Sequence, residues 1–280
     1  MKIRPSPIKL KLAHASFFIS VLFSSPGQVY AQNQTNTLLT FENQQRIEQA
    51  VRNWAINPQM LLDTFLWFQD LTRDSQESSA YAELSRLKFM HAQLEENRPL
   101  RLQLFRESMS IADQALALNT SNSRALFWKA VAMGKIVEDG GILSALKMLR
   151  PMEQILLRVI ELDELYENAG AHRALGRMYH LLPSFPIGFG NKQKAYTHLT
   201  RAHELFPNDL ITRAFYADLL FDIGKKKDAR MHADFVLATP VDEANAREFA
   251  EYITIAQKIV YKTGRTLAQH DSLMITEMNR

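Results

Sequence analysis

The sequence predicts an all-α fold built from stacked helical hairpins, and three observations support this prediction. Only 10 glycines and 10 prolines occur among the 280 residues, so few positions interrupt a helix. Leu, Ala, Arg, Glu and Gln recur throughout, and most of these are strong helix formers. Small residues also return at the spacing of paired helices, as in Ala217 and Ala229. With 46% hydrophobic and 22% charged residues, the chain is long enough to bury a sizeable core.

Residues 1–31 show the three-part pattern of a secretory signal peptide. Four basic residues come first, the apolar run LAHASFFISVLF follows at 12–23, and a polar, turn-prone stretch closes the segment. Val29 and Ala31 place small residues before Gln32, which predicts cleavage there and a periplasmic or secreted mature protein. The apolar run is too short to span a bilayer comfortably. A mitochondrial transit peptide and an uncleaved membrane anchor remain as alternatives.

The formal net charge of +3 arises from this leader. Without its four basic residues, 29 Lys and Arg remain against 30 Asp and Glu, which is a balance of −1. We therefore expect no nucleic acid partner on electrostatic grounds. The chain contains no cysteine, which excludes disulfides, cysteine metal sites and a cysteine nucleophile. Its stability must come from its core.

A segment at 32–79 separates the leader from the repeats. We expect a disordered start followed by two amphipathic helices at about 41–55 and 59–72, which pack on the repeat domain. Pro58 divides these helices, because proline is well suited to the first position of a helix.

Residues 80–263 carry the tetratricopeptide pattern, a repeat of about 34 residues that forms two antiparallel helices. The clearest unit has the expected residues at the motif positions: Leu175, Gly176, Tyr179, Ala195, Leu199, Ala202 and Pro207. We expect about three to four degenerate repeats in a solenoid with extra terminal helices. A helix at 242–262, ending before Gly264, is expected to cap the last hairpin, with a polar tail at 264–280.

The clearest repeat contains an insertion, LLPSFPIGFGN, at 181–191. Gly176 and Ala195 lie 19 residues apart where the motif has about 12, so the extra residues fall in the turn between the helices. The insertion carries three apolar residues, which are Phe185, Ile187 and Phe189. Two interpretations are open: these side chains tuck onto the neighbouring hairpin, or they form a lip over the groove or contact a partner.

Three stretches place the chain beside a known family: FWKAVAMGKI, GGILSALKMLRPMEQILLRVIELD and AHRALGRMYHLLPSFPIGFGNKQKAYTHLTRAHELFPND. Over about 80–240 the sequence resembles the TatT-like family, periplasmic tetratricopeptide proteins associated with TRAP transporters. The resemblance implies a binding or assembly role beside an extracytoplasmic solute receptor, with a hydrophobic or organic-acid ligand as a further possibility. The regulator of microtubule dynamics family of eukaryotes is a similar alternative with the same Leu-Gly-Arg helix, but its aromatic-rich segment is missing here.

The repeat register predicts a ligand or partner groove. Motif positions 5, 9 and 12 of the first helices usually face it, and they are Lys129, Met133 and Ile136, then Arg173, Arg177 and His180, then Ala214, Asp218 and Phe221. Because arginine matches carboxylate geometry with its planar donors, the cations favour an acidic ligand or peptide. The alternative is that they are solvated helix faces paired with nearby Asp or Glu.

No catalytic constellation is present in the sequence. The pairs His172/His180 and His198/His203 lack the spacing of a HExxH metal site, and no glycine-rich phosphate loop or GxSxG motif occurs. We therefore expect no enzyme, no metal and no cofactor. The leading hypothesis is a non-catalytic exported scaffold that binds a partner protein, and the alternative is a periplasmic protein that binds a small organic acid or lipid.

Overall fold

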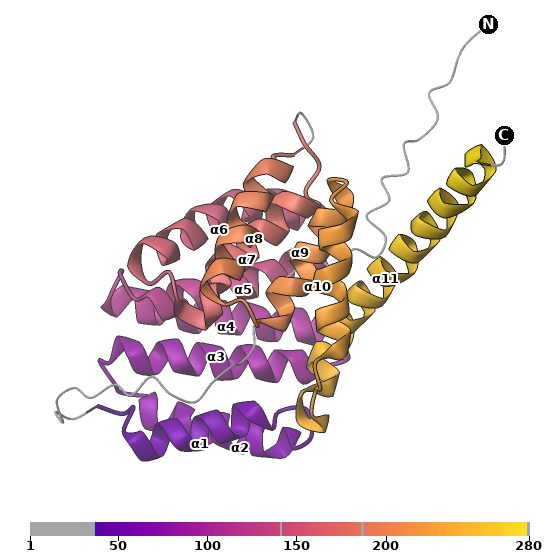
Figure 1. Ribbon diagram of the computed structural model, residues 1–280. Helices are drawn as coiled ribbons and strands as arrows, with labels where there is room; N and C mark the ends of the chain where they lie inside the picture. The colour runs from indigo at the N-terminus through magenta and orange to yellow at the C-terminus, as the bar shows by residue number, and fades with distance from the viewer. Residues whose placement is uncertain (1–36, 141, 186–187, 279–280) are drawn as a thin grey trace, which may run out of the picture.

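A computed structural model describes residues 37–140, 142–185 and 188–278 of the chain. This part contains eleven α-helices and no strand, as Figure 1 shows. The predicted all-α fold is confirmed. The predicted signal peptide at 1–31 lies outside the described residues.

The helices run in chain order as α1 (Phe41–Arg52), α2 (Pro58–Thr72), α3 (Ser78–Leu94), α4 (Arg98–Leu118), α5 (Ser123–Gly140), α6 (Ile142–Leu162), α7 (Tyr166–Leu181), α8 (Lys192–Leu205), α9 (Leu210–Asp222), α10 (Lys226–Ala238) and α11 (Glu243–Met278). Local sequence explains several starts. Pro58 opens α2, and the side chains of Asn57, Asn97, Asn191 and Asp209 each accept a hydrogen bond from the first turn of a helix.

Helices α3 to α10 form four antiparallel hairpins that stack in sequence order. Each hairpin packs on the next, α11 lies against α9 and α10 at one end, and α2 packs on α3 at the other. Arg86 on α3 reaches Glu48 on α1 at 2.6 Å, so both N-terminal helices contact the stack. No helix among the described residues combines the length and apolarity needed to cross a bilayer.

Small residues at the repeat positions allow the helices of a hairpin to approach closely. Ala195, Ala217 and Ala229 are fully buried. A Cβ added to Gly176 on α7 would lie 2.5 Å from Cγ of Leu199 on α8, which is closer than carbon atoms can pack. The glycine at this motif position is therefore required by the contact between α7 and α8.

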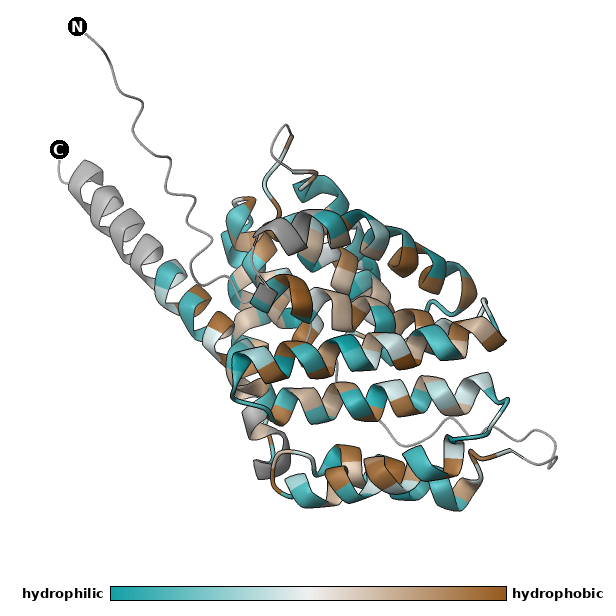
Figure 2. Cartoon of the chain, turned by 180° about the vertical axis from the view of Figure 1, so that it is seen from behind, coloured by the Kyte–Doolittle hydropathy of each residue, from teal (hydrophilic) through white to brown (hydrophobic). Residues whose placement is uncertain are grey.

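One hydrophobic core runs through the whole stack. Phe89 packs on Phe105 and Trp128 with ring centroids 5.2 and 5.4 Å apart, so aromatic rings link α3, α4 and α5. The Trp128 indole donates a hydrogen bond to the hydroxyl of Tyr166 on α7 at 2.9 Å, which extends the link to the third hairpin. Apolar and polar residues alternate along the helices in Figure 2, as expected for amphipathic helices around a core.

One helix differs in length from the prediction. Helix α11 continues to Met278 instead of ending before Gly264, so the predicted end of this helix is wrong. The helix continues through Gly264, and a Cβ added there would have no neighbouring atom within 4 Å. Helix α6 extends over 21 residues and contains Pro151.

Candidate functional site on the inner face and the 181–191 loop

Two ion pairs and one histidine–carboxylate hydrogen bond join α7 to the α9 segment, and their α7 members are predicted groove residues. The nitrogen-to-oxygen distances are 3.3 Å for Arg173–Asp209, 2.7 Å for Arg177–Asp218 and 3.0 Å for His180–Asp222. We call the surface formed by these six residues the inner face. Its three cationic or titratable α7 side chains are all buried, so they face carboxylates of the protein and not solvent.

Arg173 also holds an unusual turn at the start of α7. Glu167, Asn168 and Ala169 have φ values of 52°, 54° and 57°, the left-handed region that residues other than glycine rarely adopt. Arg173 donates hydrogen bonds to the carbonyl oxygens of Glu167 and Asn168 at 3.2 and 3.3 Å. The same guanidinium therefore stabilises the turn and neutralises Asp209.

Arg177 is held from two sides. Its guanidinium lies 4.5 Å from the centre of the Phe215 ring and donates to Asp218 at 2.7 Å. On the next turn, the hydrogen bond from His180 lowers the pKa of Asp222. The side chains that the sequence suggested for binding an acidic ligand are therefore already paired with carboxylates of the protein.

The remaining predicted groove residues lie apart from this cluster or on its edge. Lys129 pairs with Asp113 on α4 at 2.6 Å, and Met133 is buried in the core with 5% of its surface exposed. Phe221 is half-buried, with the ammonium of Lys262 at 5.0 Å from its ring centre. The structure thus brings four predicted residues together on α7 and α9, which are Arg173, Arg177, His180 and Asp218, and places Lys129 and Met133 elsewhere.

A half-buried carboxylate, Glu167, and a buried one, Glu248, lie near the inner face and were not anticipated from the sequence. Burial raises the pKa of Glu167 and raises that of Glu248 well above its usual range, although Arg173 lowers both in part. One carboxylate oxygen of Glu248, Oε1, has no hydrogen-bond partner among the described residues. Glu167 and Glu248 come from α7 and α11, about 80 residues apart, so no local pattern could have revealed their proximity.

A second acidic group surrounds Arg86 on α3. Arg86 Nη1 lies 2.6 Å from Glu48 and 2.8 Å from Glu83, and both Arg86 and Glu83 are buried. Burial alone would raise the pKa of Glu48, but the charge of Arg86 and its hydrogen bond lower it overall. Carboxylates thus pair with the buried guanidinium of Arg86, as they do with those of Arg173 and Arg177.

The insertion loop is anchored by aromatic contacts at its base. Phe189 packs edge-on against Tyr179 at 6.3 Å, and the guanidinium of Arg150 lies 3.8 Å from the Phe189 ring centre. The Tyr179 hydroxyl donates to Glu153 at 2.5 Å, which ties α7 to α6. Phe189 therefore tucks onto the neighbouring hairpin, one of the two interpretations drawn from the sequence.

A histidine pair lies behind this anchor. The Nδ1 atoms of His172 and His198 are 2.9 Å apart, and the His198 ring stacks on Tyr179 with an interplanar angle of 24°. Burial, followed by the charge of His172, lowers the pKa of His198 to about 4. Burial also lowers the pKa of His172, so both rings favour the neutral form where α7 packs on α8.

The tip of the loop behaves differently. Phe185 is 90% exposed, and Ile187 lies outside the described residues. The backbone below the tip is fixed by hydrogen bonds from the amides of Gly188 to Ser184 at 3.2 Å and of Gly190 to Pro183 at 2.9 Å. A Cβ at Gly190 would lie 1.8 Å from the carbonyl oxygen of Leu182, so only glycine permits this path.

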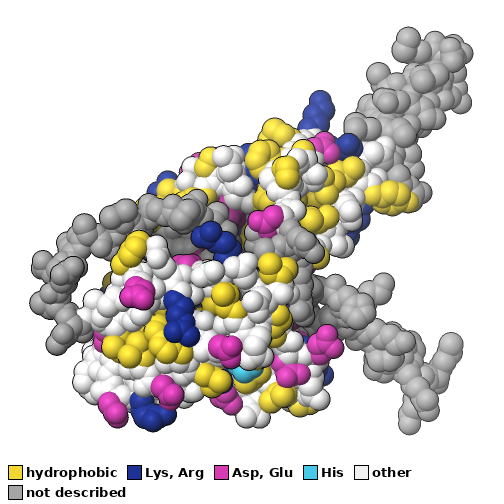
Figure 3. Space-filling model, turned by 90° about the horizontal axis from the view of Figure 1, so that it is seen from below, with side chains coloured by type: hydrophobic (Ala, Val, Ile, Leu, Met, Phe, Trp, Pro, Cys, Tyr) yellow, Lys and Arg dark blue, Asp and Glu magenta, His cyan; other side chains and the backbone are white. Residues whose placement is uncertain are grey.

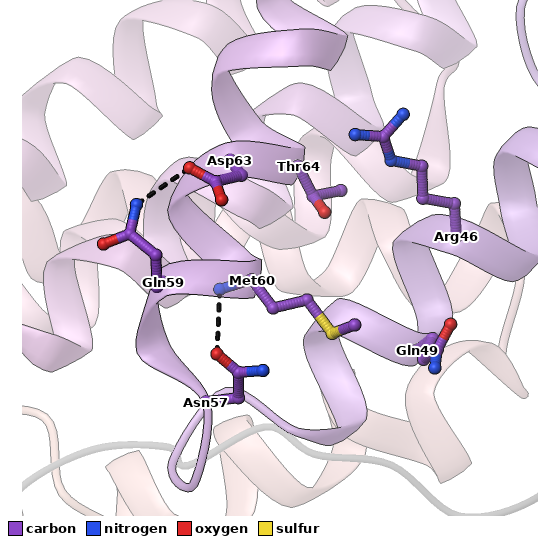
Figure 4. Close-up of a pocket in the computed structure, with 7 residues that line it drawn as sticks. All are labelled: Arg46, Gln49, Asn57, Gln59, Met60, Asp63 and Thr64. Atoms are coloured by element: carbon purple, nitrogen blue, oxygen red, sulfur yellow. Dashed lines mark hydrogen bonds between the residues drawn. The ribbon is translucent and has the colours of Figure 1, made fainter.

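A hollow of about 320 Å³ lies between α1 and α2. Figure 4 shows its lining, in which the side chain of Gln59 bonds to Asp63 at 2.8 Å and Asn57 caps the amide of Met60 at 3.1 Å. Figure 3 shows the underside of the molecule, where apolar patches are scattered between charged side chains. These hydrogen bonds are local to the start of α2, and the lining does not define a ligand class.

Among the residues that the structure describes, no three His, Cys, Asp or Glu side chains gather as a metal site. The fold and the paired inner face define a tetratricopeptide-like helical solenoid. A solved relative by fold is TTC0263, a thermophilic TPR protein in Thermus thermophilus, with a TM-score of 0.55, 16% identity, and coverage of 76% of this chain and 98% of that one. At this identity the likeness shows the fold alone.

The family is shown by the sequence itself. Residues 82–261 match the family described as TRAP transporter T-component, and the chain belongs to that family. The resemblance predicted from the sequence is thereby confirmed. No curated protein matches the chain.

Proposed function

We propose that this protein is a non-catalytic periplasmic scaffold that binds the extracytoplasmic solute receptor of a TRAP-type uptake system. The observation that supports the proposal most directly is the match to the TRAP transporter T-component family over 82–261. A solenoid of stacked hairpins suits this role, because it offers an extended, rigid surface for another protein.

The state of the inner face favours a protein partner over a small acidic ligand. Arg173 and Arg177, the two arginines that would recognise an organic acid, are buried and already paired with Asp209 and Asp218. An incoming carboxylate would have to displace a protein carboxylate from a buried site, which carries a large desolvation cost. A small-molecule role at this face therefore has less support.

The test is co-elution of two purified proteins. The mature chain beginning at Gln32 is mixed with the solute receptor of a TRAP transporter from the same organism, both without and with its solute, and the mass of the eluted species is measured by light scattering. We expect a complex with the summed mass. A periplasmic receptor of an unrelated transporter serves as the control, and separate elution of both partners at concentrations of about 50 μM would contradict the proposal.

A further inference from the structure

The base of the insertion loop and the turn between α9 and α10 meet at one end of the hairpins. The ammonium of Lys192, at the start of α8, donates to the carbonyl oxygen of Asp222 at 3.1 Å. The ammonium of Lys225, in the next turn, donates to the hydroxyl of Tyr196 at 2.9 Å. Both turns lie at the upper edge of the stack in Figure 1, and the loop projects beyond the helix ends.

This edge carries a local excess of positive charge. The exposed lysines are Lys192, Lys194, Lys225, Lys226 and Lys227. The exposed acids of the same segments are Asp222, which is engaged by His180, and Asp228. We call these five lysines the basic edge. The mature chain as a whole is nearly neutral, so the excess belongs to this edge and not to the molecule.

The described part of the loop presents one aromatic side chain beside the basic edge. Phe185 is 90% exposed, while the neighbouring Phe189 is held against Tyr179 and Arg150. Hydrogen bonds from the amides of Gly188 and Gly190 to the carbonyl oxygens of Ser184 and Pro183 join the residues before Phe185 to those after it.

We propose that Phe185 and the basic edge form the docking site for the partner, and that Phe185 enters an apolar pocket rimmed by carboxylates on a partner protein. The proposal rests on the protein-binding function proposed above. A central aromatic anchor surrounded by complementary charge is the usual composition of an energetically dominant contact between proteins. Phe185 and the lysines supply those two components.

An anionic membrane is the competing partner, because it too binds exposed aromatic side chains and lysines. Peripheral membrane binding draws on a broad apolar surface in addition to basic charge. Among the described residues of the loop a single large apolar side chain is strongly exposed, because Phe189 is held against Tyr179 and Arg150. These observations favour the pocket of a protein.

The experiment places a photo-activated cross-linker at the anchor. A benzoylphenylalanine residue replaces Phe185 in the full chain in cells, and a second chain carries it at Leu66 on α2, which is 56% exposed at the other end of the stack. Mass spectrometry identifies the cross-linked peptide. The partner is then purified and titrated against the wild-type protein and its variants, because capture alone does not establish the site.

Two sets of variants separate the components. Phe185→Ser should lower the affinity about 10-fold or more, as removal of an anchor does. The double variant Lys226→Gln/Lys227→Gln should slow association roughly 3-fold to 10-fold at low salt, whereas Lys226→Arg/Lys227→Arg keeps the charge and should bind normally. Neither lysine makes a side-chain hydrogen bond or ion pair in the described structure, so the variants should fold like the wild-type protein.

The outcomes are distinct. A cross-link from position 185 to a peptide beside Asp or Glu, together with these affinity losses, supports the docking site. A partner that cross-links only at Leu66, or that binds Phe185→Ser unchanged, overturns the site and leaves the proposed function standing. Failure to bind any protein overturns both. Binding to phosphatidylglycerol vesicles that Lys226→Gln/Lys227→Gln abolishes, without a protein cross-link, assigns the edge to a membrane and overturns the proposal.

Discussion

Replacement of Arg173 by methionine should destabilise the protein severely. The side chain is 1% exposed, and its guanidinium bonds to Asp209 and to two carbonyl oxygens of the left-handed turn. Methionine fills similar volume without charge, so it leaves the buried carboxylate of Asp209 unpaired and both carbonyls without their donor. Removal of one partner of a buried ion pair costs about 3–5 kcal/mol.

The magnitude is large enough to measure in urea. For a protein of this size, the free energy of unfolding falls by roughly 3 kcal/mol per molar urea, so a loss of about 3–5 kcal/mol lowers the midpoint by about 1–1.7 M. Arg230→Met is the matched control, because Arg230 pairs with Asp234 at 2.8 Å on the surface. The control should lose no more than about 1 kcal/mol, as exposed pairs usually do.

A double variant tests the physical cause. Asp209→Asn retains a side-chain acceptor for the Thr212 amide, which Asp209 caps at 2.7 Å, while it removes the charge. If the ion pair is responsible, the combined loss for Arg173→Met and Asp209→Asn is smaller than the sum of the single losses by about 1–3 kcal/mol. A loss below about 1 kcal/mol for Arg173→Met, or additive losses, would refute this account of the inner face.

Three further predictions concern packing, pH and the loop. Gly176→Ala should lower the urea midpoint. The steric clash of the new methyl group with Leu199 costs about 1–3 kcal/mol, whereas the higher helix propensity of alanine gains about 1 kcal/mol. A raised midpoint would contradict the close contact between α7 and α8. Burial and nearby positive charges lower the pKa values of His198 and His232 to about 4. The unfolded chain therefore binds more protons than the folded protein between pH 6.5 and 4, and the melting temperature should fall over this range as the pH is lowered. His198→Asn should make this fall shallower, and an unchanged slope would refute the lowered pKa of His198. Gly190→Ala should speed limited proteolysis within the loop, because its Cβ would lie 1.8 Å from a carbonyl oxygen, and cleavage at the wild-type rate would show that the loop tolerates a side chain.

The fold was predictable because its signals are local. Small residues such as Gly176 and Ala195 mark where two helices touch, and the 12-residue spacing of Ala217 and Ala229 marks a hairpin. The continuation of α11 through Gly264 was missed, because a glycine inside a helix has the same sequence appearance as a terminating one.

The inner face was predictable only in part. Arg173, Arg177 and His180, which the repeat register placed on one side of α7, all contact carboxylates of the α9 segment. Their acidic partners lie 36 to 42 residues further along the chain, and the buried Glu248 lies on α11. Long-range pairing of this kind depends on how the hairpins stack, which a local pattern does not encode. Whether a groove residue is free or neutralised therefore requires the structure.

Hydrogen–deuterium exchange with a saturating partner tests the account most directly. If the partner docks on Phe185 and the basic edge, the amides of residues 188–196 and 222–228 should exchange more slowly in the complex. The amides of α7 at residues 171–180 should exchange at the same rate with and without the partner. The side chains that α7 turns toward the inner face are already paired with carboxylates of the protein and are not expected to bind the partner. Protection confined to α7 and α9 at the inner face, with an unaltered edge, would contradict the account.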